Sequence, residues 1–237
     1  MIDGKKILVV VPARGGSKGI PFKNIQLVNG VPLVALVGNV IKEIPFVDKA
    51  VVSTDSEKIA ALARESGIAA PFLRPENLSG DRVADWDVLV HALDECERED
   101  ATKYDVIVML QPTSPMRKPK HVRDTIEMLI NEKRDSVWTL SETDSKAHPL
   151  KQLTVKNGDL NYYDEKGGQI IARQQLDKLF HRNGIAYAMT RECLLEQKTI
   201  KGKNAGALII EEPTVNIDTL WDLKLVNFLM SETNSYE

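Results

Sequence analysis

An uninterrupted apolar strand that leads directly into a glycine-rich loop constrains the fold of this chain more than any other feature. Residues 7–11 are all aliphatic, and such a run is typical of a parallel strand buried on both faces. The loop at residues 12–24 carries three glycines and three cations: Gly15, Gly16, Gly19, Arg14, Lys18 and Lys23. Glycine lets main-chain N–H groups approach an anion, and the cations add charge and side-chain donors. We therefore expect an α/β sheet whose first strand ends in a polyphosphate-binding loop.

This loop lacks two familiar nucleotide-binding patterns. Ile20 follows Gly19 where a Walker A loop requires Gly-Lys-Ser or Gly-Lys-Thr, and there is no Gly-x-Gly-x-x-Gly fingerprint. Both an ATPase and a NAD-dependent enzyme are therefore disfavoured. For the loop taken alone, a basic surface turn without a ligand stays open as the simpler alternative.

Strands and helices alternate over the first 140 or so residues, which predicts the fold class. Strands are expected at residues 7–11, 49–53, 105–110 and 136–140, and helices at residues 32–44, 56–66, 86–98 and 119–132. Such alternation implies right-handed βαβ crossovers. We therefore expect an α/β fold with a Rossmann-like, mostly parallel sheet covered by helices on both faces.

The pattern changes after about residue 141. A β-hairpin is expected at residues 151–155 and 160–163, with its turn at residues 157–159, and a short polar helix at residues 170–179. Because this stretch has few core-type residues, we predict that residues 141–182 form a projecting arm that packs against another subunit.

The chain is then expected to return to the body and complete it. Strands are predicted at residues 184–189, 207–210 and 215–217, followed by a closing helix at residues 220–230 and a frayed end at residues 232–237. Trp86, Trp138 and Trp221 are interpreted as core residues. Residues 1–237 are therefore interpreted as one catalytic domain with an arm.

Charge and composition narrow the choice of partners. The formal net charge is −3, so no polybasic field favours nucleic acid or an anionic membrane, and a small anionic ligand fits better. Two cysteines without metal-type spacing indicate free thiols in a reducing compartment. The N-terminal residues lack a signal-peptide pattern, and the longest apolar runs are strand-sized. We therefore expect a cytoplasmic protein.

Eight motifs, in order along nearly the whole chain, carry a family resemblance. They are Val11–Asn24, Val52–Asp55, Leu73–Glu76, Leu110–Pro115, His148–Lys151, Arg173–Gln175, Asn183–Gly184 and Asn216–Thr219. Together the sequence resembles the acylneuraminate cytidylyltransferases, also called CMP-sialic acid synthetases. The resemblance implies a fold of the nucleotide-diphospho-sugar transferase type and transfer of CMP from CTP to an N-acylneuraminate or related nonulosonic acid. It also implies that residues 141–182 are a dimerisation arm and that the enzyme is a homodimer with shared active sites.

The nucleotide side of the expected site comes from the first loop and from Arg74. Arg14, Lys18 and Lys23 are interpreted as catalytic cations that neutralise the triphosphate and the leaving pyrophosphate. Asn24 offers amide donors and an acceptor, which suits nucleotide recognition. With Arg14, the resemblance places Ala13, Gly15, Asn24 and Arg74 in the nucleotide-binding set. Solvated surface cations are the alternative.

The sugar side is expected at Gln111, Lys151 and Arg173. Gln111 ends an apolar strand before Pro112, and its amide can both donate to and accept from a sugar. A guanidinium such as that of Arg173 suits bidentate capture of a sugar carboxylate. These assignments depend on the resemblance, which implies that arm residues reach the partner subunit's sugar site. Dimer contacts or solvated charges are the alternative for Lys151 and Arg173.

A metal site is expected at Asn216 and Asp218, two residues apart on a predicted strand and therefore on one face. The resemblance implies that Mg²⁺, which Mn²⁺ can replace, is held here against the nucleotide phosphates, and that Asp218 is catalytic. The family usually has aspartate at both positions, whereas this chain has Asn216. An amide oxygen can ligate a hard cation but brings no charge, so weaker metal binding is expected.

Two other functions stay open at this point. One is the same reaction on another sugar acid of the octulosonate or legionaminate type. The other is a nucleotide-binding homologue that has lost turnover because of Asn216. The sequence carries no recognisable code for the substituents of the sugar.

Overall fold

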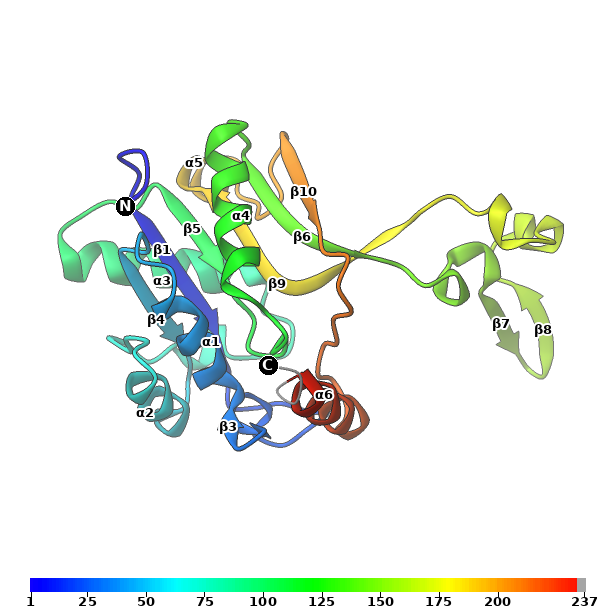
Figure 1. Ribbon diagram of the computed structural model, residues 1–237, viewed down its shortest axis with the longest axis horizontal. Coiled ribbons are helices and arrows are strands. Elements are labelled where there is room, and N and C mark those ends of the chain that lie inside the picture. Colours follow the sequence, from blue (N-terminus) through cyan, green and yellow to red (C-terminus); the bar gives the residue numbers. More distant parts are fainter. Residues whose placement is uncertain (234–237) are drawn as a thin grey trace.

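The structure is a computed structural model that describes residues 1–233, and the body of the molecule is built on one six-stranded sheet (Figure 1). Its strands are β1 (Ile7–Pro12), β4 (Lys49–Ser53), β5 (Val106–Met109), β6 (Ser136–Glu142), β9 (Phe180–Thr190) and β10 (Ala205–Ile209). They lie in the order β10-β6-β9-β5-β1-β4. Strand β9 runs antiparallel to both of its neighbours, and the other three pairings are parallel. The expected mostly parallel sheet is confirmed.

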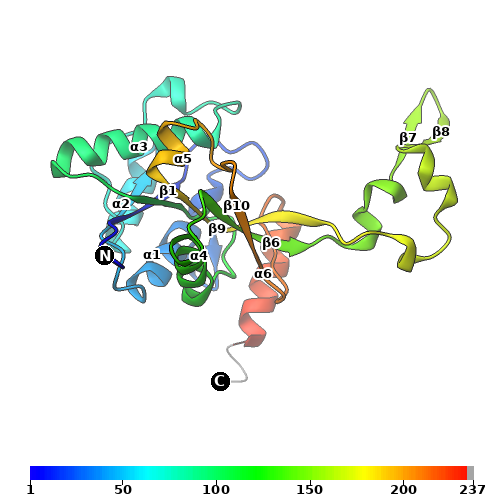
Figure 2. The same cartoon turned by 90° about the horizontal axis from the view of Figure 1, so that it is seen from above.

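Helices cover both faces of the sheet, as Figure 2 shows from above. One face packs against α1 (Leu33–Lys42), α2 (Glu57–Glu65) and α4 (Pro119–Asn131), and the other packs against α3 (Asp85–Asp100) and α5 (Arg191–Leu195). Side chains alternate along a strand, so β1 supplies both cores. Ile7, Val9 and Val11 enter one core, whereas Leu8 and Val10 enter the other. The apolar run of β1 is therefore explained by burial on both faces.

The last helix, α6 (Leu220–Thr233), packs on a third, smaller core together with the short hairpin of β2 (Leu27–Val28) and β3 (Val31–Pro32). Val226 of α6 is buried there beside Ile20 and Leu33. Trp221 lies on the outer side of α6 with 72% of its surface exposed, so its interpretation as a core residue was wrong. Residues 232–237 were expected to be frayed. Residues 232 and 233 are helical instead, and residues 234–237 lie outside the described part of the chain.

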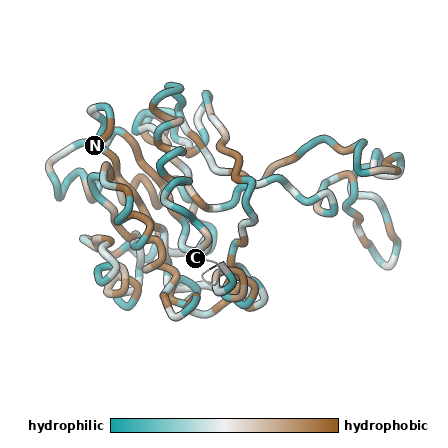
Figure 3. The backbone as a smooth tube through the Cα atoms, viewed as in Figure 1, coloured by the Kyte–Doolittle hydropathy of each residue, from teal (hydrophilic) through white to brown (hydrophobic). Residues whose placement is uncertain are grey.

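The segment between β6 and β9 projects away from the body (Figure 1). It contains the antiparallel hairpin of β7 (Leu153–Lys156) and β8 (Asp159–Tyr162), which confirms the expected hairpin. It also contains four short 3-10 turns, at Ser145–Ala147, Pro149–Lys151, Glu165–Gln169 and Arg173–Gln175. Figure 3 shows mixed hydropathy along this projection, in contrast to the apolar strands of the body.

Two predicted elements are absent from the described residues. The helix expected at residues 170–179 is reduced to the single turn Arg173–Gln175, because the Gln175 side chain accepts the main-chain N–H groups of Ile171 and Ala172. Such local bonds compete with a helix. The strand expected at residues 215–217 is an extended crossing segment tied to the body by one main-chain bond, from Ile217 N–H to the Thr113 carbonyl at 2.9 Å.

No helix among residues 1–233 is both long and apolar enough to cross a membrane.

Candidate active site

A cavity of about 440 Å³ opens beyond the carboxyl ends of β1 and β5. Ligands of open α/β sheets bind at this edge, where loops from several strands meet. The cavity brings together seven residues that the sequence singled out: Arg14, Lys18, Lys23, Asn24, Arg74, Gln111 and Asp218. It also includes Asp81 and Asp85, which sequence reasoning missed.

The loop after β1 is held in place from two sides. The Gly15 N–H donates to Asp55 Oδ1 at 2.7 Å, and Asn24, which is buried, donates from its side chain to the Arg14 carbonyl at 2.9 Å. A Cβ at Gly19 would lie 2.6 Å from the Asp218 carbonyl oxygen, so only glycine fits this crossing. The glycine therefore brings the phosphate-binding loop directly against the segment that carries Asp218.

Each loop cation is paired with a carboxylate. Arg14 contacts Asp81 at 2.8 Å, Lys18 pairs with the same carboxylate, and Lys23 contacts Asp218 at 2.9 Å. The hydrogen bond from Lys18 holds the pKa of Asp81 below its ordinary value, so this carboxylate stays ionised. No local pattern marked Asp81, which lies in a polar loop between α2 and α3.

Arg74 lies beneath the cavity rather than on the surface. Its guanidinium donates to the Ser53 carbonyl at 2.9 Å, and its main-chain N–H donates to the Thr54 carbonyl at 2.7 Å. Burial lowers the pKa of Arg74, and its Nε has no hydrogen-bond partner within the described chain. Buried donors without a partner are uncommon in proteins, which marks this position beside the cavity.

Gln111 leaves the end of β5 and packs against Gly184 at the bend of β9. Its N–H donates to the Gly184 carbonyl at 3.4 Å, and a Cβ at Gly184 would lie 2.5 Å from Gln111 Oε1. Gly184 has a φ of +69°, which is the left-handed region that favours glycine. The Gln111 side chain is therefore placed by a second strand as well as by its own.

Asn216 and Asp218 have different surroundings. Asn216 Oδ1 accepts a hydrogen bond from Ser114 Oγ at 2.6 Å, whereas the Asp218 side chain is 75% exposed and lines the cavity. The Asp222 carboxylate accepts from the N–H groups of Asp218 and Thr219, which fixes the turn into α6.

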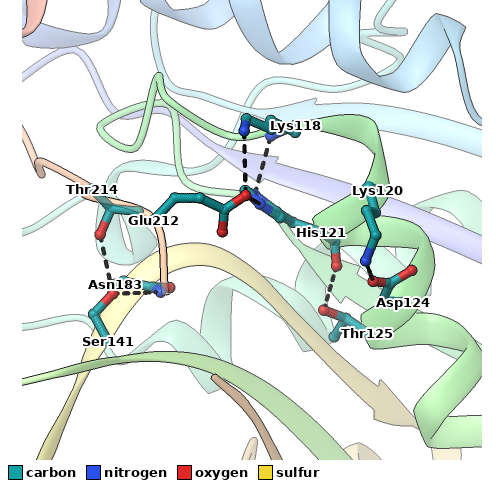
Figure 4. Close-up of polar contacts among 9 residues, drawn as sticks. All are labelled: Lys118, Lys120, His121, Asp124, Thr125, Ser141, Asn183, Glu212 and Thr214. Atoms are coloured by element: carbon teal, nitrogen blue, oxygen red, sulfur yellow. Dashed lines mark hydrogen bonds and ion pairs between the residues drawn. The ribbon is translucent and has the colours of Figure 1, made fainter. Parts of the chain in front are cut away.

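The crossing segment that carries these two residues is anchored upstream by polar contacts (Figure 4). Glu212 contacts Lys118 at 3.2 Å, and Thr214 contacts Ser141, which in turn accepts from the Asn183 side chain at 3.1 Å. The segment is thus held by these side-chain contacts and by the main-chain bond of Ile217, without belonging to the sheet.

The other two sugar-binding candidates lie on the projection. Arg173 lines a separate cavity of about 620 Å³ together with His148 and Lys178, and Lys151 ends the neighbouring turn. Neither residue lines the cavity at the strand ends of its own chain. Their predicted role therefore requires a second subunit.

Comparison with known proteins gives one family and a consistent set of relatives. Residues 8–227 match the cytidylyltransferase family. The chain is 29% identical to the CMP-N,N'-diacetyllegionaminic acid synthase of Campylobacter jejuni over 97% of both proteins. It is 29% identical to the pseudaminic acid cytidylyltransferase of Campylobacter jejuni over 94% of this chain and 96% of that protein. It is 28% identical to the N-acylneuraminate cytidylyltransferase of Escherichia coli, covering 97% of this chain but 53% of that longer protein.

Among solved structures, CMP:2-keto-3-deoxy-manno-octonic acid synthetase complexed with CTP has a TM-score of 0.71 and covers 96% of this chain and 99% of its own. Its identity of 20% supports a shared fold.

Proposed function

This chain belongs to the cytidylyltransferase family and is a CTP-dependent enzyme, and from that premise we propose that it transfers CMP to a nonulosonic acid. The anomeric hydroxyl attacks the α-phosphorus of CTP, the bond to the bridging oxygen breaks, and pyrophosphate and a proton are released. The observation that carries the proposal is the joint placement of the loop cations, Gln111 and Asp218 around one cavity.

The phosphate chemistry is assigned to the loop. Charge in such a transition state is spread over the phosphate oxygens, so positioned cations supply most of the stabilisation. Arg14, Lys18 and Lys23 face the triphosphate, and their present partners Asp81 and Asp218 give way as the phosphates enter. Asn24 and Arg74, which line the cavity, are assigned to the cytidine together with Ala13 and Gly15. The N–H groups of Ala13 and Gly15 already donate to the Ser53 carbonyl and to Asp55 Oδ1, so these two residues shape the loop beside the nucleotide.

Mg²⁺, or Mn²⁺ in its place, is assigned to Asp218. No three His, Cys, Asp or Glu side chains gather into a metal site within residues 1–233. Mg²⁺ is commonly held by one or two carboxylates plus substrate phosphates, so a single exposed carboxylate in the cavity fits it. Asn216 would contribute an uncharged oxygen that already accepts from Ser114. When bound, the ion would neutralise developing phosphate charge.

The acceptor is assigned to Gln111 of one subunit and to Lys151 and Arg173 of its partner. The hairpin on the projection supports a homodimer, because the pairs Leu153–Tyr162 and Val155–Leu160 form one apolar face. That face is exposed, with Val155 at 71%, and a two-stranded hairpin of this kind is marginal without a covering partner. In an isologous dimer, both sites would be composite.

The relatives act on N-acylneuraminate, pseudaminate and legionaminate by their names, so the acceptor is assigned to this class of nine-carbon acids. The test is pyrophosphate release with CTP, UTP, ATP and GTP against a panel of these acids. We expect turnover with CTP and one of the acids. Tight CTP binding without pyrophosphate release would instead identify a nucleotide-binding homologue. This is the second candidate, because Asn216 brings no charge to the metal site.

A further inference from the structure

Arg117 is a buried cation that no step of the proposed reaction uses. It lies in the turn between β5 and α4 and is 5% exposed. No carboxylate lies within ion-pair distance of it among residues 1–233. Burial lowers the pKa of Arg117 to about 9. Burying a charge without a counter-ion costs free energy, because the charged group loses its hydration. Hydrogen bonds within the protein must therefore replace those lost to water.

The guanidinium makes those bonds to three carbonyls, one just after β5 and two in β9. Nη2 donates to the Gln111 carbonyl at 2.6 Å and to the Gly184 carbonyl at 3.0 Å, and Nε donates to the Ile185 carbonyl. Arginine can do this because its donors form a rigid planar fork. Without it, three buried carbonyls would lose a partner, and each unpaired group costs free energy.

Two further contacts lock the same unit. Tyr187 OH accepts from the Gly184 N–H at 2.7 Å. The Ser114 hydroxyl shares its one proton between Asn216 Oδ1 at 2.6 Å and the Asn183 carbonyl at 2.9 Å. Arg117 and Ser114 therefore fasten the β5 exit to the β9 bend, and Tyr187 holds that bend from within β9. Gln111 is the member of this unit that lines the cavity.

We propose that Arg117 is a positioning residue that fixes the Gln111 amide for the acceptor sugar by clamping the Gln111 and Gly184 carbonyls in one buried fork. This inference rests on the proposed function and deepens it, because it locates the origin of acceptor affinity outside the cavity. Lysine cannot replace arginine here, since a single ammonium lacks the planar fork that reaches all three carbonyls.

The test is a double-mutant cycle between Arg117→Lys and Gln111→Ala. Kinetics use the acid, among N-acetylneuraminate, pseudaminate and N,N'-diacetyllegionaminate, that the parent turns over fastest. Arg117→Lys should raise the KM for that acid about tenfold and leave the Kd for CTP within about twofold. Adding Arg117→Lys to Gln111→Ala should raise the KM for the acid by less than about twofold more. A residue that acts through the Gln111 side chain has nothing left to position once that side chain is removed.

Arg191→Lys is the matched control. Arg191 pairs with buried Glu97 at the opposite end of the sheet, so its variant should lose stability without a shift in either substrate constant. If Arg117→Lys does not fold, Tyr187→Phe removes only the hydroxyl acceptor of Gly184 and should raise the acid KM in the same non-additive way. If the KM effects of the two substitutions multiply in the double mutant, or if affinity falls equally for CTP and the acid, the inference about Arg117 is wrong. The proposed function would still stand. A parent without turnover on any acid would overturn the proposed function and the inference with it.

Discussion

At the scale of single residues, Asp81 pairs with cations of the loop that we assign to phosphate binding. It neutralises two of the three loop cations, and its lowered pKa keeps it charged through the working pH range. An incoming triphosphate therefore competes with a carboxylate that the protein itself supplies. Coulomb attraction between CTP and the loop is weaker than the count of cations alone indicates.

Asp81→Asn is expected to tighten CTP binding several-fold at low ionic strength, with a smaller gain at high salt because exposed charges are screened. Titration calorimetry with CTP at two salt concentrations measures this. Asp124→Asn is the control, since it removes the same charge beside Lys120 on α4, outside the cavity. Weaker CTP binding by Asp81→Asn at both salt concentrations would show that Asp81 orients Arg14 rather than competing with the phosphates.

Asp218→Ala is expected to lose far more turnover than Asn216→Ala, because only Asp218 offers ligand charge to Mg²⁺. Asn216→Asp should lower the Mg²⁺ concentration needed for half-maximal rate. Pyrophosphate release across a Mg²⁺ titration measures both effects. If Asp218→Ala titrates like the parent, the metal assignment is wrong.

At the scale of elements, Glu97 joins α3 to the start of α5 at the end of the sheet away from the cavity. It accepts from Arg191, from Lys103 and from the Tyr104 N–H. Burial alone would raise the pKa of Glu97, but these bonds outweigh it and hold the pKa at about 2. The ionised carboxylate therefore stabilises the fold above its unfolded pKa, and this contribution is lost as pH falls towards 2.

Glu97→Gln is expected to reduce the free energy of unfolding by about 2 kcal/mol near pH 7, which corresponds to a fall in Tm of roughly 4–8 °C. The difference from the parent should shrink as pH falls below about 4.5 and disappear near pH 2. Thermal melts followed by circular dichroism across this range test it. A Tm difference that is independent of pH would contradict the charge-based explanation.

The same scale shows what a sequence can predict of this fold. Strands β1, β4 and β6 and helix α4 were predicted to within about two residues, because their apolar periodicity is local. The direction of β9 was not predicted, since it depends on how the chain returns from the projection. Part of the site could also be predicted from the sequence: the loop cations and Gln111 directly follow predicted strands. Asp81 and Arg117 have no local signal, because Asp81 pairs with Arg14 and Arg117 binds the carbonyls of Gly184 and Ile185, all distant in the sequence.

At the scale of the whole molecule, the projection carries Lys151 and Arg173 away from the cavity of their own chain. An isologous dimer would let each projection complete the partner's site. Arg173→Ala should raise the KM for the sugar acid and spare CTP binding, whereas Arg14→Ala should impair CTP binding.

Mixing these two impaired variants, at substrate concentrations where each alone shows little turnover, should restore part of the activity, because a heterodimer contains one site free of both changes. Light scattering establishes the dimer, and tagged subunits report exchange. A monomer in solution, or no recovered activity despite proven subunit exchange, would contradict the shared site.

Product analysis tests the central claim most directly. The protein is incubated with Mg²⁺, CTP and each nine-carbon acid in turn, and ³¹P NMR follows the nucleotide. We expect a new CMP phosphodiester resonance and an equal amount of pyrophosphate with at least one acid, and little product when UTP replaces CTP. Equal turnover of UTP, or CTP left intact with every acid, would contradict the assignment of this chain as a CTP-dependent nonulosonic acid cytidylyltransferase.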